Sequence, residues 1–336
     1  MQNRDNVTVI LAGGEVVQRR DSNTERVPLN EEELTALLPQ DLRERTAFLS
    51  WSPQPISHYT LRMCSDLTQL ANAQVDAGGA RGVVITCDTQ ALTELSYFAS
   101  LVWKFTQPLI FTASIFSAGT SGSETELHIV QSVRAALSDI CWGQGVLVCV
   151  QDALYSAMDL IHFSNFRRSG FTASHGGPLS VFSEPSGSLL ALRAPCPIKP
   201  RRGRDIDVNT TPARAVEIVD ASLGGGTILL NALLDKRVEE LEGLVVAGFD
   251  DGDVPPSWVP LLRKIVRSGL PAVLCSRCPN GLVQTIDTFE GSASRLLEMG
   301  LINAGTLSPI QARIRLALAL GAGLKDQELR EYMQVS

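Results

Sequence analysis

The chain has 336 residues, of which 44% are hydrophobic and 19% are charged, and its formal net charge is -7 at pH 7. This size favours two domains with separate cores, and the acidic balance argues against nucleic-acid binding, which needs concentrated positive charge. No apolar run approaches the roughly 18–20 residues that span a bilayer, and the polar residues 1–5 leave no room for a signal peptide. We therefore expect a cytoplasmic protein with no nucleic-acid and no membrane partner.

Short apolar runs rich in Val, Ile and Leu alternate along the chain with amphipathic stretches. The runs are predicted strands at 7–12, 82–86, 108–112, 145–150, 227–230, 243–247 and 272–276. The amphipathic stretches are predicted helices at 30–38, 60–77, 90–104, 123–138, 257–268 and 309–322, the last with Ser308 as its N-cap and Pro309 in its first turn. This alternation is typical of an α/β fold with a mostly parallel sheet between helices.

Two polar segments interrupt this pattern. Residues 195–213 are dense in Pro, Gly and charge and have no apolar periodicity, so we predict an N-terminal domain at 1–194, a linker, and a C-terminal domain at 214–336. Residues 18–28 follow the first predicted strand. Because ligands of such sheets bind beyond the carboxyl ends of strands, this segment is a candidate for a mobile flap over a site.

Several segments together carry a resemblance to the bacterial-type L-asparaginases. Residues 9–15 (VILAGGE) and 82–94 (GVVITCDTQALTE) each resemble a signature of that family. Three further segments match in the same order: 145–148 followed by Asp152 and Asp159, 243–248 followed by Gly252, and 300–313 (GLINAGTLSPIQAR). The resemblance thus extends over nearly the whole chain.

The resemblance implies a fold and a chemistry. The fold is α/β, with a larger N-terminal domain, a smaller C-terminal domain and active sites between two subunits of a tight homodimer, often paired into a homotetramer. The chemistry implied for the family uses a threonine nucleophile after the first strand and a second threonine assisted by a lysine and an aspartate. Such a hydroxyl needs a neighbouring base to take its proton and donors to hold the oxyanion. No cofactor and no metal are implied.

At these functional positions the chain departs from the family pattern. Glu15 stands at the place of the threonine nucleophile, so the hydroxyl of an acyl-enzyme route is lost. Thr89 keeps the place of the second threonine, whereas Gln90 replaces the substrate-binding aspartate. His162 occupies the lysine position, and Asp159 keeps its place three residues earlier.

The resemblance also indicates residues for substrate binding. Gly13 and Gly14 allow the backbone to approach a ligand closely, and a serine ahead of the second helix is either Ser50 or Ser52. The acidic loop around Asp251 either reaches across the dimer towards the neighbouring pocket or is solvated. The full predicted substrate-binding set is Gly14, Ser52, Asp88, Gln90, Ser114 and Asp251. The apolar residues Ile115 and Phe116 favour a ligand less like an amino acid.

The predicted catalytic residues are Glu15, Thr89 and His162, and each has an alternative interpretation. Glu15 is either a general acid or base, or a polar residue paired with an arginine of 18–20. His162 is either a proton relay that is hydrogen-bonded by Thr89, or a surface histidine. A nucleophilic role for Cys87 is disfavoured, because small buried cysteines are common in cores.

Three hypotheses about function follow. The first is an enzyme with an asparaginase-like scaffold and a rebuilt pocket, which performs acid/base chemistry (cyclisation, isomerisation, elimination or hydrolysis) on a small metabolite and is not an ordinary L-asparaginase. The second is an amidohydrolase that uses Thr89 as nucleophile and His162 as base. The third is a non-catalytic binding subunit.

Overall fold

In a computed structural model the chain forms two compact units, Met1–Pro200 and Arg201–Ser336, each with its own sheet. The structure describes residues 6–20, 26–51, 54–183, 186–193, 205–236 and 240–334. Ser52, residues 21–25 of the predicted flap and residues 195–204 of the predicted linker lie outside the described residues. None of the helices in the described residues combines the length and apolar character needed to cross a membrane.

The sheet of the first unit has eight strands in the order β12-β11-β8-β7-β6-β5-β1-β4. Five of them run parallel: β4 (Thr46–Ser50), β1 (Val7–Leu11), β5 (Gly82–Thr86), β6 (Leu109–Thr112) and β7 (Val146–Val150). The other three extend the sheet antiparallel: β8 (Ala153–Ser156), β11 (Ser180–Ser183) and β12 (Ser188–Ala191). All four strands predicted for this unit are confirmed within one residue at either end.

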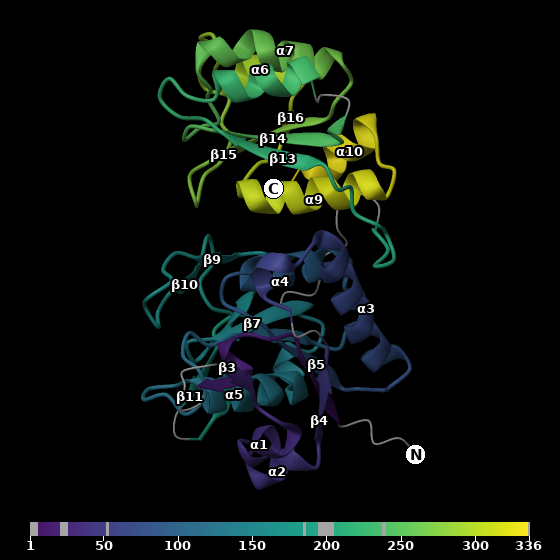
Figure 1. The fold of residues 1–336 in the computed structure, drawn as a ribbon, viewed down its shortest axis with the longest axis vertical. Helices are drawn as coiled ribbons and strands as arrows, with labels where there is room; N and C mark the ends of the chain where they lie inside the picture. Colours follow the sequence, from purple (N-terminus) through teal and green to yellow (C-terminus); the bar gives the residue numbers. More distant parts are fainter. Residues whose placement is uncertain are drawn as a thin grey trace. The chain divides into compact units, whose positions relative to one another are not determined.

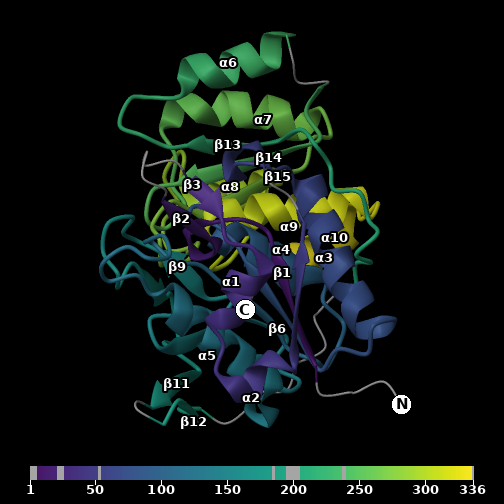
Figure 2. The same cartoon turned by 60° about the horizontal axis from the view of Figure 1, so that its bottom comes forward.

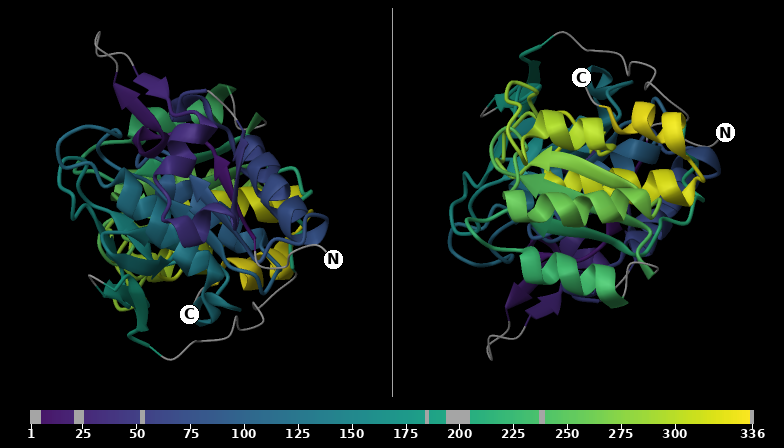
Figure 3. Two further views of the ribbon diagram at one scale, coloured as in Figure 1. Left: turned by 90° about the horizontal axis from the view of Figure 1, so that it is seen from below. Right: turned by 90° about the horizontal axis from the view of Figure 1, so that it is seen from above.

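Helices cover both faces of this sheet, as the fold class predicts (Figure 1; Figure 3, left). On one face lie α3 (Leu61–Asp76) and α4 (Leu92–Val102), and on the other α5 (Thr125–Leu137) together with α1 (Glu31–Ala36) and α2 (Gln40–Arg43). The core on the α5 side combines alternate residues of the strands with one stripe of each helix. It includes Val9, Val84, Ile110, Ile129 and Leu34. Burial of this stripe is what stabilises the helices.

A tight turn joins the parallel and antiparallel parts of the sheet. Gln151 and Asp152 both have φ of 56°, between paired residues Val150 and Ala153. Two consecutive left-handed residues in a two-residue loop form a type I′ turn, whose twist matches that of a hairpin. Gln131 on α5 donates a hydrogen bond to Asp152 Oδ1 at 2.8 Å and so ties the turn to the helix below it.

Two small hairpins stand apart from the main sheet. The ends of the predicted flap pair antiparallel as β2 (Gln18–Arg20) and β3 (Arg26–Pro28). The other hairpin pairs β9 (Leu160–His162) with β10 (Phe171–Ala173). The sequence pattern predicts neither hairpin, because three-residue strands are too short to show an alternation.

The second unit has a parallel sheet in the order β13-β14-β15-β16. The strands are β13 (Val216–Asp220), β14 (Gly243–Gly248), β15 (Ala272–Ser276) and β16 (Ile302–Asn303). Helices α6 (Thr227–Lys236), α7 (Val259–Arg267) and α8 (Ala293–Met299) cover one face, and α9 (Pro309–Gly321) covers the other, with α10 (Asp326–Met333) packed on α9 (Figures 1 and 2; Figure 3, right). A mixed α/β chain with a larger and a smaller unit confirms the predicted fold class.

One predicted strand, at 227–230, is wrong, because these residues form the first turn of α6. Their apolar run continues with helical spacing: Leu230, Leu233 and Leu234 pack into the core, whereas Ile228 is 87% exposed. In a strand, buried and exposed side chains would alternate with a period of two. The buried residues here are three and four positions apart, which is the spacing of a helix. The strand of this region is β13.

Helix α9 begins as the sequence predicts. Ser308 Oγ accepts a hydrogen bond from Gln311 N at 3.3 Å, and Gln311 Oε1 accepts one from Ser308 N at 3.1 Å, which completes a capping box.

We expect Ser308→Ala to lower the free energy of unfolding by about 1 kcal/mol, because one backbone N–H at the start of α9 loses its acceptor. Ser308→Asp retains an acceptor and should stay close to the unchanged protein. Thermal or denaturant unfolding of the full chain measures the difference. Equal stability of the alanine and aspartate variants would contradict this role of the cap.

Candidate active site

The strand order of the first unit creates a switch point at β1. From β1 the chain moves to β4 on one side, and then crosses to β5 on the other side of β1. Ligands of open α/β sheets bind outside the carboxyl ends of the strands at such a point. The segments there are residues 12–15 after β1 and residues 87–90 after β5. They contain two of the predicted catalytic residues, Glu15 and Thr89.

These two segments are packed directly against each other. Ala12 N donates to Thr86 O at 3.0 Å, which continues the ladder beyond the strands. Gly14 has φ of 88°, and a Cβ at this position would lie 2.1 Å from Cys87 O. Only glycine fits this close approach. Gly13 has a similar φ of 94°, but a Cβ there would meet nothing within 4 Å.

Glu15 is buried at the start of a 3-10 turn, with 9% of its surface exposed. The hydroxyl of Ser117, from the loop after β6, donates a hydrogen bond to Glu15 Oε2. Burying a carboxylate is costly unless it accepts hydrogen bonds, and this contact offsets part of that cost. Of the two arginines in 18–20 considered as partners for Glu15, Arg19 forms an ion pair with Glu33 at 3.2 Å, and the side chain of Arg20 lies outside the described part of the structure.

The loop after β6 is held by a hydrogen bond within the loop and by contacts with two other segments. Ser114 Oγ donates to Phe116 O at 2.8 Å within the loop, and Ala118 N donates to Gln18 O at 2.8 Å. Arg168 donates to Gly122 O at 2.7 Å, and its guanidinium carbon lies 5.4 Å from the centre of the Phe116 ring. These contacts fix the backbone from which Ser117 reaches Glu15, and they engage the Ser114 hydroxyl within its own loop.

The segment after β5 combines one buried and three more accessible side chains. Cys87 is completely buried, and this burial, together with the charge of Asp88, raises the pKa of its thiol well above the usual value. A neutral, buried thiol supports the core interpretation of Cys87. Asp88 Oδ1 accepts a hydrogen bond from Gln90 N at 3.0 Å. Thr89 is half-buried, and within the described part of the chain its hydroxyl has no hydrogen-bond partner.

Sequence reasoning missed two residues that build this site, Ser117 and Tyr59. The Tyr59 hydroxyl donates to Ala12 O at 3.0 Å, and its ring packs edge-on against Trp51 with centroids 5.3 Å apart. Both are polar side chains in loops that follow parallel strands, a position that could have marked them as candidates. Their partners, however, follow only from the folded backbone.

Two family models match the chain and account for most of its length. The model described as "Asparaginase, N-terminal" matches residues 6–190, and the one described as "Glutaminase/Asparaginase C-terminal domain" matches residues 215–333. The chain belongs to the asparaginase family. Its named relatives in this family are amidohydrolases and related enzymes.

Individual relatives agree with this assignment. The chain is 26% identical to an L-asparaginase of Bacillus licheniformis, over 81% of this chain and 82% of the relative. It is 24% identical to L-asparaginase 2 of Escherichia coli, over 97% and 92% respectively. Among solved structures, a probable cytoplasmic L-asparaginase from Campylobacter jejuni superposes with a TM-score of 0.82, covering 98% of this chain and 99% of that one at 21% identity. This last likeness shows the asparaginase-type fold.

His162 of this asparaginase-family chain lies on β9, which packs against α4. Its Nε2 lies 2.9 Å from Ser164 O and donates to it, and its ring stacks on Phe171 with centroids 4.4 Å apart. No hydrogen bond joins His162 to Thr89 among the described residues. The predicted bond between them is therefore not formed. Thr89 nevertheless lies close in sequence to α4, the helix on which β9 packs, because α4 begins at Leu92, three residues after Thr89.

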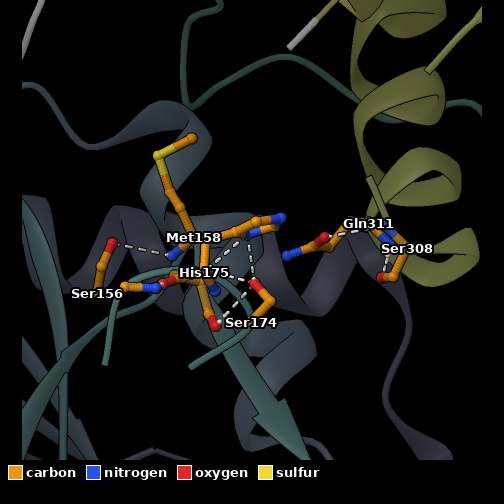
Figure 4. A network of polar contacts seen from close by, with 8 residues as sticks. Ser156, Met158, Ser174, His175, Ser308 and Gln311 are labelled. Atoms are coloured by element: carbon orange, nitrogen blue, oxygen red, sulfur yellow. Dashed lines mark hydrogen bonds and ion pairs between the residues drawn. The ribbon is translucent and has the colours of Figure 1, made fainter. Parts of the chain in front are cut away.

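Ser174, His175 and Asp159 meet beside this hairpin and have the composition of a catalytic triad (Figure 4). Both partners, however, lie on the same histidine nitrogen: Ser174 Oγ is 2.8 Å and Asp159 Oδ1 is 3.0 Å from His175 Nδ1. A relay needs the serine on one ring nitrogen and the carboxylate on the other. The cluster is an anchor for the loop after β10.

Asp159 is the acceptor at the centre of this anchor. Partial burial alone would raise its pKa, but hydrogen bonds from Ser174, from His175 and from the backbone N–H of Gly176 outweigh burial and lower the pKa below its usual value. The charged form is thus the one that the folded loop stabilises.

In the second unit, Asp251 follows β14 in a loop held by Gln284. The Gln284 side chain donates to Asp251 Oδ1 at 2.8 Å, and Gln284 N donates to Asp251 O at 3.0 Å. Asp253 Oδ1 accepts a hydrogen bond from Ala293 N at 2.9 Å. Among the described residues, no three His, Cys, Asp or Glu side chains are grouped so that they could hold a metal ion.

The contact between the first two site segments can be tested with matched glycine variants. Gly13→Ala and Gly14→Ala both place a side chain at positive φ, which costs about 1 kcal/mol. Only Gly14→Ala also forces Cys87 O to move, at a further cost of roughly 1–3 kcal/mol. We expect a clearly lower thermal unfolding midpoint for Gly14→Ala. Equal midpoints for the two variants would contradict the close packing.

The anchor predicts a pH dependence for Asp159→Asn. The folded-state pKa of Asp159 lies below its unfolded value of about 3.9, so its stabilisation is complete above that pH and is lost as pH falls through the folded pKa. We expect the variant to unfold more easily at neutral pH, with the difference shrinking below about pH 4. Urea unfolding at several pH values measures this. Asp66→Asn, in an exposed ion pair with Arg62, is the control and should have little effect.

Proposed function

We propose that this asparaginase-family chain is an enzyme with a rebuilt pocket, in which Glu15 transfers protons to and from a small metabolite. One observation carries the proposal. A buried carboxylate, hydrogen-bonded by Ser117, stands at the switch point of the sheet, at the place where the family resemblance implies a threonine nucleophile. A carboxylate at this place suits general acid/base catalysis, and it supplies no hydroxyl for an acyl-enzyme.

The geometry supports a division of roles between the two packed segments. Ser117 orients the Glu15 carboxylate, so that proton transfer has a defined direction. Thr89, on the neighbouring segment, has a hydroxyl that can donate a hydrogen bond to the substrate. The contact of Gly14 with Cys87 O keeps the two segments together. Gly14, Asp88, Gln90 and Ser114 remain proposed contributors to substrate binding.

The names of the relatives favour an amide as the reacting group. Glu15 would take a proton from an attacking water as its oxygen bonds to the carbonyl carbon, and would return the proton to the nitrogen as the C–N bond breaks. The balance is one water added across one C–N bond, with no covalent enzyme intermediate. If the nucleophile is a group of the substrate itself, the same proton transfers lead to cyclisation.

A second candidate is an amidohydrolase that uses Thr89 as its nucleophile. It is supported by the half-buried, unpartnered Thr89 hydroxyl within the described chain and by the names of the relatives. In this candidate His162 is the base, and it would have to exchange its bond to Ser164 O for one to Thr89.

The domain boundaries and the oligomeric state of the chain are further proposals. We propose the domain boundaries 1–194, 195–213 and 214–336, and a homodimer or homotetramer in which Asp251 contributes to a neighbouring pocket. One relative, from Methanothermobacter thermautotrophicus, is a component of a glutamyl-tRNA(Gln) amidotransferase and is 26% identical over 76% of this chain and 58% of its own length. This name supports association with a partner chain as a further proposal, and a non-catalytic binding subunit is the third candidate function.

The test compares Glu15→Gln and Thr89→Val in the full chain. Ammonia release is measured first with L-asparagine, L-glutamine and D-asparagine, and then with a panel of small amides, each analysed for ring closure as well. We expect Glu15→Gln to reduce turnover of the active substrate by about 10²–10⁴-fold, because proton transfer is lost. Thr89→Val should cause a smaller loss, because one hydrogen bond to the substrate is removed.

Glu33→Gln is the matched control, since Gln can still complete the capping box of α1. Its turnover should equal that of the unchanged protein. If Thr89→Val abolishes turnover and Glu15→Gln does not, the threonine-nucleophile candidate is correct. A ligand that binds tightly and is never converted would indicate a non-catalytic subunit and overturn both candidates.

A further inference from the structure

A second site of unassigned role lies entirely within the second unit. A groove of about 710 Å³ runs between α7 and α8 and is open to solvent along one side. Ligand pockets commonly measure about 300–1,000 Å³, so the groove has the size of a small-molecule site. Val259 and Leu296 lie beneath the groove as buried core residues, and half-buried Met299 provides apolar surface within it.

The groove is lined by three arginines and by two glutamates, Glu290 and Glu298, so it has a small net positive charge in a chain that is acidic as a whole. Arg263 and Arg267 line it from α7, and Arg295 lines it from α8. Arg263 and Arg267 are four residues apart, so their side chains lie on the same face of the helix. Neither has a hydrogen-bond or ion-pair partner among the described residues. Two like charges at this spacing repel each other and weaken a helix slightly.

Helix electrostatics explains only part of this arrangement. Lys264 and Arg267 lie in the last turn of α7, where positive charge interacts favourably with the helix dipole. Arg263 lies outside that turn but inside the groove, whereas Lys264 lies outside the groove. The feature common to Arg263 and Arg267 is therefore their position in the groove, and not their position in the helix.

Arg295 is oriented from the opposite side. Its Nε donates to Thr288 O at 3.2 Å and its Nη1 donates to Glu298 Oε2 at 3.0 Å. A guanidinium has five N–H donors in a fixed plane, so three donors remain for a ligand. These two hydrogen bonds hold the guanidinium plane of Arg295 in place. A ligand that binds there therefore has less side-chain conformational entropy to remove.

We propose that this groove binds a small phosphate monoester, with the phosphoryl group between the arginines of α7 and α8 and the rest of the molecule against Met299. A phosphoryl group has three acceptor oxygens and a charge near −2. These match the guanidinium groups of Arg263 and Arg267 and the remaining donors of Arg295, whose own charge is paired with Glu298, better than a singly charged carboxylate would. Glu290 at the groove and the net charge of -7 disfavour a long polyanion such as nucleic acid. The site is independent of the chemistry proposed for Glu15.

Calorimetric titration of the full chain tests the proposal. The probes are adenosine monophosphate, glucose 6-phosphate and inorganic phosphate, with adenosine as the partner that lacks a phosphoryl group. We expect at least one of the two monoesters to bind more tightly than inorganic phosphate, and adenosine not to bind. The double variant Arg263→Gln/Arg267→Gln should weaken binding by about 100-fold, since each charge-assisted contact is worth about tenfold.

Lys264→Gln removes the same charge from the same helix outside the groove, and its affinity should be unchanged. Unfolding without a probe shows that the variants fold, and the monoester should raise the unfolding midpoint of the unchanged protein but not that of the double variant. The proposal is overturned if no phosphate probe binds at concentrations up to about 1 mM, or if the double variant binds as well as the unchanged protein. If no probe binds and the double variant changes the oligomeric state, the arginines form a contact between protein chains, and this result would also overturn the proposal.

Discussion

The close contact of Gly14 with the Cys87 carbonyl is the constraint on which the candidate active site depends. It brings the segments after β1 and β5 together at the one point where neighbouring strands lead the chain in opposite directions. Glu15 and Thr89 follow these two neighbouring strands, and the contact holds the segments that carry them against each other. The backbone bond from Ala12 N to Thr86 O holds the same two strands together just before the contact.

The buried carboxylate of Glu15 at this point has structural consequences. A buried carboxylate needs hydrogen-bond donors in a way that a threonine side chain does not. Ser117 supplies one, and its loop is held in turn by Arg168 through Gly122 O and the Phe116 ring. The environment of Glu15 therefore extends into a neighbouring loop and the β9–β10 region.

Most of the fold could be predicted from the sequence, because continuous apolar runs such as that of β5 are recognisable as buried strands. The same reasoning fails at 227–230, because a short apolar run does not show by itself whether it belongs to a strand or to a helix. The contacts within the candidate site could be predicted only in part. Glu15 and Thr89 stand next to recognisable strands, whereas the contacts of Ser117 and Tyr59 join residues 102 and 47 positions apart. His162 is placed by a hairpin too short to show a pattern.

This difference between fold and site has a physical origin. The strand ends are joined by backbone groups, as in the bonds from Ala12 N to Thr86 O and from Cys87 N to Thr112 O, which any side chain leaves intact. Side chains beyond those bonds can therefore change while the scaffold persists. Glycine at position 14 is the exception, because the absence of its side chain is itself part of the scaffold. A carboxylate can follow that glycine without disturbing the sheet, so membership of the asparaginase family and the identity of the reaction are decided by different atoms.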